Sequence, residues 1–114
     1  MIAGVDAQSG LTLYGGDAEI YKELLRSFVD SASVFLEKIR TVSIQTLPDY
    51  AISVHEIKGA SASIGADGVS RKAESFEKLS KNGDSNGVLA RNDAFIAELS
   101  KLIDDIKTWN KTNA

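Results

Sequence analysis

Apolar residues recur at helical spacing along most of this 114-residue chain, and glycines and a single proline divide it into helical windows. The alternation of apolar and polar residues that marks a strand is absent. The pattern predicts an all-α protein with a short helix over about residues 6–14, a bundle over about residues 17–109 and a polar tail over residues 110–114. No linker or internal repeat divides residues 1–114, so we expect a single domain.

Four long helices are expected in the bundle, over about residues 17–42, 48–64, 67–82 and 84–109. Asp17 and Asp67 can each cap a helix, and Pro48 suits a first turn. The first long helix carries its apolar face on Ile20, Leu24, Phe28, Phe35 and Ile39, broadened by Tyr21, Leu25 and Val29; the last carries its face on Val88, Asn92, Phe95, Leu99, Leu102, Ile106 and Trp109. Helices joined by short turns bury such faces together as an antiparallel up-down-up-down four-helix bundle, which the short extra N-terminal helix covers at one end.

His55, the only histidine, lies on the predicted helix over residues 48–64 but outside its apolar face. That face consists of Tyr50, Val54, Ile57, Ser61 and Ile64, which recur at steps of four and three. At about 100° per residue, His55 points about 140° away from the mean direction of this face, and Gly59 about 180° away. We therefore expect both residues to face solvent.

The neighbours of His55 suit a group that carries a phosphoryl. A glycine in an exposed helix interior costs about 1 kcal/mol relative to alanine, so Gly59 suggests clearance for a docking partner. Lys58 can reach the imidazole or a group attached to it. Ile52 lies on the same outward side, where an exposed β-branched residue gains little unless a partner covers it. An ordinary surface histidine and an isolated surface isoleucine are the open alternatives.

Charge and composition exclude several functions. The net charge of -3, the pI near 5.1 and the scattered basic residues disfavour a nucleic-acid partner. No cysteine and one histidine do not suit a transition-metal site, so we expect neither a metal nor a cofactor in this chain. No run approaches the roughly 18 apolar residues of a membrane span, so we expect no membrane contact. We expect a cytoplasmic monomer.

The segment from His55 to Asp84 resembles the signature of histidine-containing phosphotransfer (HPt) domains of two-component phosphorelays. It contains His-x-x-Lys-Gly at residues 55–59, a run of small residues, Ile-Gly-Ala at residues 64–66, a helix with a glutamate near its end and a Lys-x-Gly-Asp turn at residues 81–84. Together with their position on a bundle helix, these patterns are more specific than His-x-x-Lys-Gly alone.

The resemblance implies a phosphocarrier in which His55 accepts a phosphoryl group from a receiver aspartate and passes it to another receiver. It implies that Lys58 is the cation near the phosphoryl oxygens and that Gly59 lets the partner come close. Ile52 and Ala62 are candidate partner contacts. The implied partners are receiver domains of response regulators or of a hybrid sensor kinase, whose cytoplasmic end this domain could form, with Mg²⁺ on the receiver.

Such a carrier needs little equipment of its own, because phosphoryl transfer mainly requires alignment and charge neutralisation. An ordinary exposed histidine is mostly neutral and nucleophilic at pH 7, so no dedicated base is expected, and Glu56 projects about 100° away from the ring. The alternative function is a non-catalytic helical adaptor, or pseudo-HPt, that binds receivers without transfer. An autonomous kinase or hydrolase would need a nucleotide loop or a nucleophile with a positioned base, which the sequence lacks.

Overall fold

The structure, a computed structural model, describes residue 2 and residues 4–112 and is all-α within them. Its helices are α1 (Ala7–Leu13), α2 (Ala18–Lys38), α3 (Leu47–Ser63), α4 (Asp67–Lys81) and α5 (Ser85–Thr112). The predicted fold class is confirmed, and the helix bounds differ from prediction mainly at two ends. The last helix continues three residues beyond Trp109, into the predicted tail, whose residues 113 and 114 lie outside the described part.

The end of α2 comes at Lys38, about four residues earlier than the periodicity predicts. The segment that follows forms its own local hydrogen bonds. The Ser43 N–H donates to the Thr46 hydroxyl at 2.9 Å, and the Thr46 N–H donates to the Ser43 carbonyl at 3.1 Å. Short hydroxyl side chains compete with helical hydrogen bonds in this way, so the chain turns before α3 begins.

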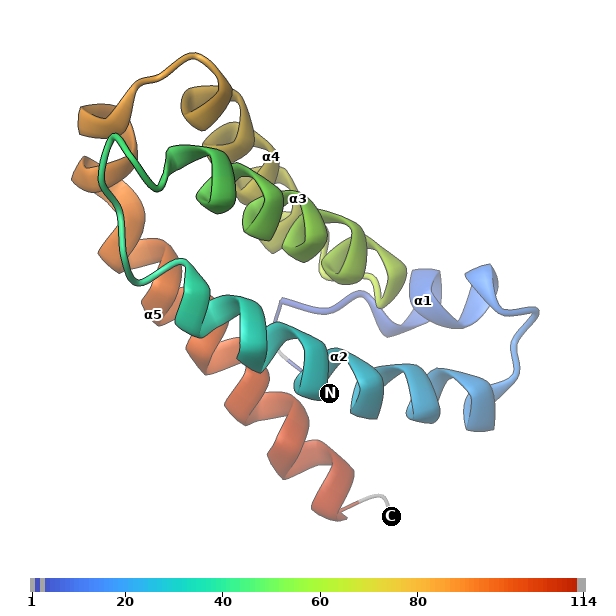
Figure 1. Cartoon of the computed structure of the whole chain (residues 1–114). Helices are drawn as coiled ribbons and strands as arrows, with labels where there is room; N and C mark the ends of the chain where they lie inside the picture. Colours follow the sequence, from blue (N-terminus) through green and yellow to red (C-terminus); the bar gives the residue numbers. More distant parts are fainter. Residues whose placement is uncertain (1, 3, 113–114) are drawn as a thin grey trace.

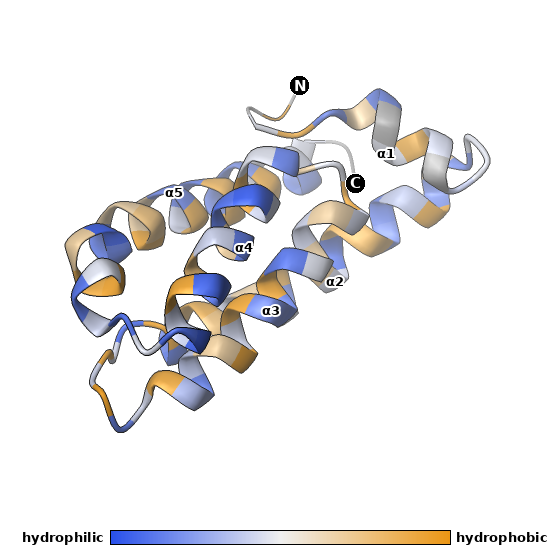
Figure 2. Ribbon diagram, turned by 90° about the horizontal axis from the view of Figure 1, so that it is seen from above, coloured by the Kyte–Doolittle hydropathy of each residue, from blue (hydrophilic) through white to orange (hydrophobic). Residues whose placement is uncertain are grey.

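The four long helices pack as a bundle, elongated to 42 × 23 × 18 Å (Figure 1). The closest partners are α3 and α4, which lie side by side, and α2 packs against both α5 and α3 while α4 packs against α5. Short turns reverse the chain between successive long helices. Hydrophobic and hydrophilic residues alternate around these helices, as amphipathic bundle helices require (Figure 2).

The predicted inner face of α3 is confirmed, because all five of its residues are buried. The face predicted for α5 is buried from Val88 to Ile106 and partly buried at Trp109. Its one polar member, Asn92, accepts a hydrogen bond from the Tyr50 hydroxyl at 2.6 Å and donates to the Ile39 carbonyl at 2.8 Å. A buried amide satisfied in this way ties α5 to α3 and to the end of α2.

The predicted inner face of α2 is partly wrong. Ile20 is exposed, whereas the buried residues of α2 are Tyr21, Leu25, Phe28, Ala32 and Leu36, followed by Ile39 at its C-terminal cap. The true face therefore lies about one residue further along the helix than the large apolar residues indicate. Ala32 is fully buried but small, so a count of large apolar residues overlooks it.

The segment before α1 and the helix α2 both form hydrogen bonds with the end of α3. The Asp6 N–H donates to the Gly65 carbonyl at 2.9 Å, and the Tyr21 hydroxyl donates to the Ile64 carbonyl at 2.7 Å. Gly65 has a φ of +84°, and a Cβ there would clash with the Asp6 carbonyl oxygen, so the junction needs glycine. The C-terminal half of α3 is thereby fixed relative to α1 and α2.

Two capping predictions have different outcomes. The Asp17 carboxylate accepts hydrogen bonds from the N–H groups of Glu19 and Ile20, so it caps α2 as predicted. Asp67 does not cap α4 but lies in its first turn, where a negative charge still complements the helix dipole. None of the helices within residues 4–112 is both long enough and apolar enough to cross a membrane.

Candidate functional site

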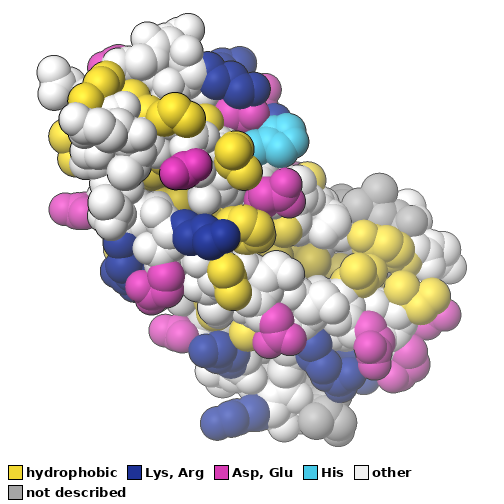
Figure 3. Space-filling model, viewed as in Figure 1, with side chains coloured by type: hydrophobic (Ala, Val, Ile, Leu, Met, Phe, Trp, Pro, Cys, Tyr) yellow, Lys and Arg dark blue, Asp and Glu magenta, His cyan; other side chains and the backbone are white. Residues whose placement is uncertain are grey.

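His55 stands on the surface of the bundle, in the middle of α3 (Figure 3). Its side chain is 58% exposed, although Val54 next to it is fully buried. The helical twist separates them, because adjacent residues on a helix point about 100° apart. The prediction that the imidazole faces solvent is confirmed.

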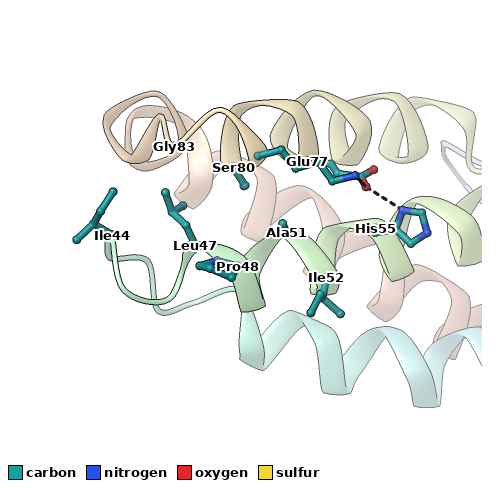
Figure 4. Close-up of a pocket in the computed structure, with 10 residues that line it drawn as sticks. Ile44, Leu47, Pro48, Ala51, Ile52, His55, Glu77, Ser80 and Gly83 are labelled. Atoms are coloured by element: carbon teal, nitrogen blue, oxygen red, sulfur yellow. Dashed lines mark hydrogen bonds and ion pairs between the residues drawn. The ribbon is translucent and has the colours of Figure 1, made fainter.

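A buried carboxylate holds one side of this exposed ring. The side chain of Glu77, on α4, is only 7% exposed, and its Oε2 lies 2.9 Å from Nδ1 of His55. Figure 4 shows the hydrogen bond crossing from α4 to α3. The close packing of the two helices therefore brings together two residues that are 22 positions apart.

Two lysines complete a cluster around the same carboxylate. Lys58 Nζ donates to Oε1 of Glu77 at 2.7 Å, and Lys81 Nζ, one helical turn after Glu77, lies 2.9 Å from Oε2. The hydrogen bond from Lys58 is the largest cause that lowers the pKa of Glu77, to about 2. Hydrogen bonds from Lys81 and His55 act in the same direction, whereas burial opposes them. Glu77 is therefore ionised at neutral pH.

The ionised carboxylate determines the tautomer of the neutral ring. A carboxylate without a proton can only accept hydrogen bonds, so Nδ1 of His55 must carry the hydrogen and donate it to Glu77. In a neutral imidazole the other nitrogen, Nε2, then holds a free lone pair. Nε2 lies across the ring from Glu77, on the side away from α4 (Figure 4). The arrangement presents a nucleophilic nitrogen in a defined orientation.

Gly59 leaves the helix surface bare one turn after His55. It is exposed and has helical backbone geometry, and a Cβ added there would meet no atom within 4 Å. No packing within the described residues therefore requires a glycine at this position. Ala62 is also exposed, three residues further along α3. The expected exposure of Gly59 is confirmed.

Ile52 lies on the other side of His55, toward the start of α3, and is 61% exposed. It borders a hollow of about 650 Å³ between the first half of α3 and the last part of α4 (Figure 4). The lining residues are Ile44, Leu47, Pro48, Ala51, Ile52, His55, Glu77, Ser80, Lys81 and Gly83. His55 thus stands between an apolar hollow on one side and the bare surface at Gly59 on the other.

Glu77 and Lys81 were not predicted as site residues, and no residue was expected to orient the ring. Glu77, not the adjacent Glu56, forms the hydrogen bond. The signals were a glutamate beside the buried positions Ala73 and Phe76, and the lysine of the Lys-x-Gly-Asp turn. Among the residues that the structure describes, no three acidic or histidine side chains gather in a way that could hold a metal ion.

The family model described as Hpt domain matches residues 23–109, which is most of the chain and includes the cluster around Glu77. None of the curated proteins or solved structures with which the chain was compared matches it. The chain belongs to the Hpt domain family.

Membership of this family implies a phosphotransfer role in a phosphorelay. Hpt domains are phosphocarriers and not autonomous enzymes, and they interact with receiver domains.

Proposed function

We propose that His55 is the phosphoacceptor of this domain and that it relays a phosphoryl group between receiver domains. The observation that carries this proposal is the exposed imidazole whose Nδ1 is held by a buried, ionised glutamate. The held ring keeps the lone pair of Nε2 free and directed outward, which a nucleophile needs.

In the proposed transfer, the lone pair of Nε2 attacks the phosphorus of a receiver's aspartyl phosphate. The N–P bond forms while the bond between phosphorus and the aspartate oxygen breaks, and the electron pair leaves with the receiver carboxylate. No proton moves, because Nδ1 keeps its hydrogen bond to Glu77. The positive charge that develops on the ring lies beside the carboxylate, which stabilises it. Attack on the phosphohistidine by a second receiver's aspartate reverses these bond changes.

Lys58 and Lys81 supply positive charge on the Glu77 side of the ring. Both are held by Glu77 in the unphosphorylated protein, and Lys81 shares its Oε2 with His55. A flexible lysine side chain can turn from the carboxylate to a new phosphoryl group, which brings two negative charges to the ring. The domain itself holds no metal in this proposal, and Mg²⁺ belongs to the partner receiver.

Phosphorylation of a His55→Gln variant tests the assignment directly. The wild-type protein should take up label both from a phosphorylated receiver and from phosphoramidate, a small phosphodonor that does not require docking. The label should be acid-labile and base-stable, as expected of phosphohistidine, and labelled ATP alone should give none. Glutamine at position 55 should abolish uptake while the helical circular dichroism spectrum stays unchanged. Full uptake by His55→Gln would contradict the proposal.

A pseudo-HPt adaptor gives a different result in the same experiment. The wild-type protein would then bind receivers but take no label from either donor, and binding would survive replacement of His55.

A further inference from the structure

We propose that a groove between α4 and α5 binds a small carboxylate that carries one aromatic ring. The groove has a volume of about 280 Å³ and is lined by residues of these two helices only. His55 and Glu77 do not line it, because α4 packs against α3 on one side and against α5 on another. The inference is independent of the proposed phosphotransfer and assigns the domain a second site.

Two aromatic rings form the floor of this groove. Phe76 of α4 and Phe95 of α5 are both buried, and their ring centroids lie 4.9 Å apart at an interplanar angle of 38°. Leu79 is half-buried and Ala94 is exposed, and both line the groove beside the rings. Aromatic rings attract one another in offset or edge-to-face arrangements, so a ligand with one ring can extend this pair.

Arg91 brings an unpaired positive charge to the same groove. Its side chain is exposed, and it forms no ion pair with any residue that the structure describes. The positions three and four residues away on α5 carry no acidic side chain; they are Gly87, Val88, Ala94 and Phe95. An arginine guanidinium can donate two parallel hydrogen bonds to one carboxylate, so Arg91 suits a carboxylate ligand.

The other two charges that line the groove neutralise each other. Lys72 of α4 donates a hydrogen bond to Oε2 of Glu98 on α5, and this ion pair bridges the two helices. With Arg91 the groove carries one net positive charge, which a monocarboxylate balances. A phosphate monoester would bring about two negative charges into a groove that also contains Glu98. Charge and floor together therefore favour an aromatic monocarboxylate.

Titration of the ¹⁵N-labelled protein with phenylacetate tests the proposal, and the neutral phenylacetamide is the matched probe. We expect saturable shifts of the backbone amides around the groove, with a Kd of about 1 mM, as a ligand of about ten non-hydrogen atoms allows. Phenylacetamide should bind at least about fivefold more weakly, because it lacks the charge that pairs with Arg91. His55→Gln should bind phenylacetate as the wild type does, which separates this site from the phosphotransfer proposal.

Two variants of the groove have matched controls on the same helices. Arg91→Gln should weaken phenylacetate binding at least about fivefold and leave phenylacetamide binding unchanged. Arg71→Gln removes an exposed arginine of α4 that does not line the groove and should alter neither affinity. Ala94→Leu should abolish binding of both ligands because it fills the groove, whereas Ala97→Leu changes an exposed residue of α5 outside the groove and should not.

Equal affinity of the wild type for phenylacetate and phenylacetamide would overturn the proposal. Wild-type affinity in Arg91→Gln would do the same, as would shifts spread over the surface lysines in place of the groove. Circular dichroism checks that each variant folds. If Ala94→Leu unfolds, Arg91→Gln still decides the test, because it changes an exposed side chain and leaves the aromatic floor intact.

Discussion

The carboxylate of Glu77 contacts three side chains that have no contact with one another in the hydrogen bonds described above. A carboxylate buried to this extent is tolerated only when it is paired and hydrogen-bonded, and His55, Lys58 and Lys81 satisfy that condition. The lysines keep Glu77 ionised, and the ionised carboxylate in turn keeps the hydrogen on Nδ1 of His55. The protonation of the exposed ring is thus determined by a residue on a different helix.

Replacing Glu77 with alanine should release the ring. We expect Nε2 to carry the hydrogen in a larger share of neutral rings, and phosphorylation by phosphoramidate to slow about tenfold, because the lone pair is then less often on the exposed nitrogen. The ¹⁵N chemical shifts of the two ring nitrogens measure the tautomer directly. Glutamine at position 77 can still accept from Nδ1 and should restore part of the rate.

The adjacent Glu56 provides the control. The ring forms its hydrogen bond with Glu77 and not with Glu56, so Glu56→Ala should leave both the ring shifts and the phosphorylation rate as in wild type. Wild-type ¹⁵N shifts in Glu77→Ala would show that Glu77 does not set the tautomer.

A glycine at position 59 lowers the stability of α3, and no packing contact among the described residues requires it. Since a Cβ there would meet no atom within 4 Å, Gly59→Ala and Gly59→Gln should both raise the free energy of unfolding by about 0.5 to 1 kcal/mol. Gln should also slow transfer from the receiver by at least about tenfold, because it obstructs alignment of the reacting groups. Ala should slow it less, and phosphoramidate should phosphorylate both variants normally.

Urea unfolding and transfer kinetics check this prediction. Ala97→Gln adds the same side chain to an exposed position of α5 and should not alter transfer. If Gly59→Gln transferred at the wild-type rate, the clearance argument would fail.

The helices were largely predictable because large apolar residues mark their buried faces. On α3 the period of Tyr50, Val54 and Ile57 places His55 outward without any knowledge of the neighbouring helices. On α2 the same reasoning placed Ile20 in the core, because that helix has apolar residues on more than one side. Which side is buried depends on how α2 packs against its neighbours, and a single helix does not carry that information.

The burial of Glu77 and its contact with His55 could not be predicted from the sequence. A glutamate beside a buried stripe is ordinarily assigned to the solvent face, and its burial here depends on partners on α3. The contact arises from the packing of α3 against α4, which aligns residues 55 and 77 across the interface. Tertiary packing, and not local spacing, therefore completed the site.

The reactive cluster also contributes to the stability of the bundle. Glu77 links α4 to α3 through both His55 and Lys58, and the Ser70 hydroxyl adds a hydrogen bond to the Lys58 carbonyl at 2.9 Å. The pKa of Glu77 is lowered from its ordinary 4.5 to about 2 in the folded protein. A carboxyl with a lowered pKa contributes stability that is fully present above its unfolded pKa and is lost as the pH falls through its folded pKa.

Glu77→Gln should therefore reduce the free energy of unfolding at pH 7 by about 1 to 2 kcal/mol, and by much less at pH 2.5. The loss stays below the full value of the pKa shift because water solvates the released lysines. Urea unfolding at both pH values measures the difference. Glu74→Gln, which removes an exposed partner of Lys78 on the same helix, should change stability by less than about 0.5 kcal/mol. An equal loss in Glu77→Gln at both pH values would mean that Glu77 stabilises the α3–α4 interface by its packing and not by its charge.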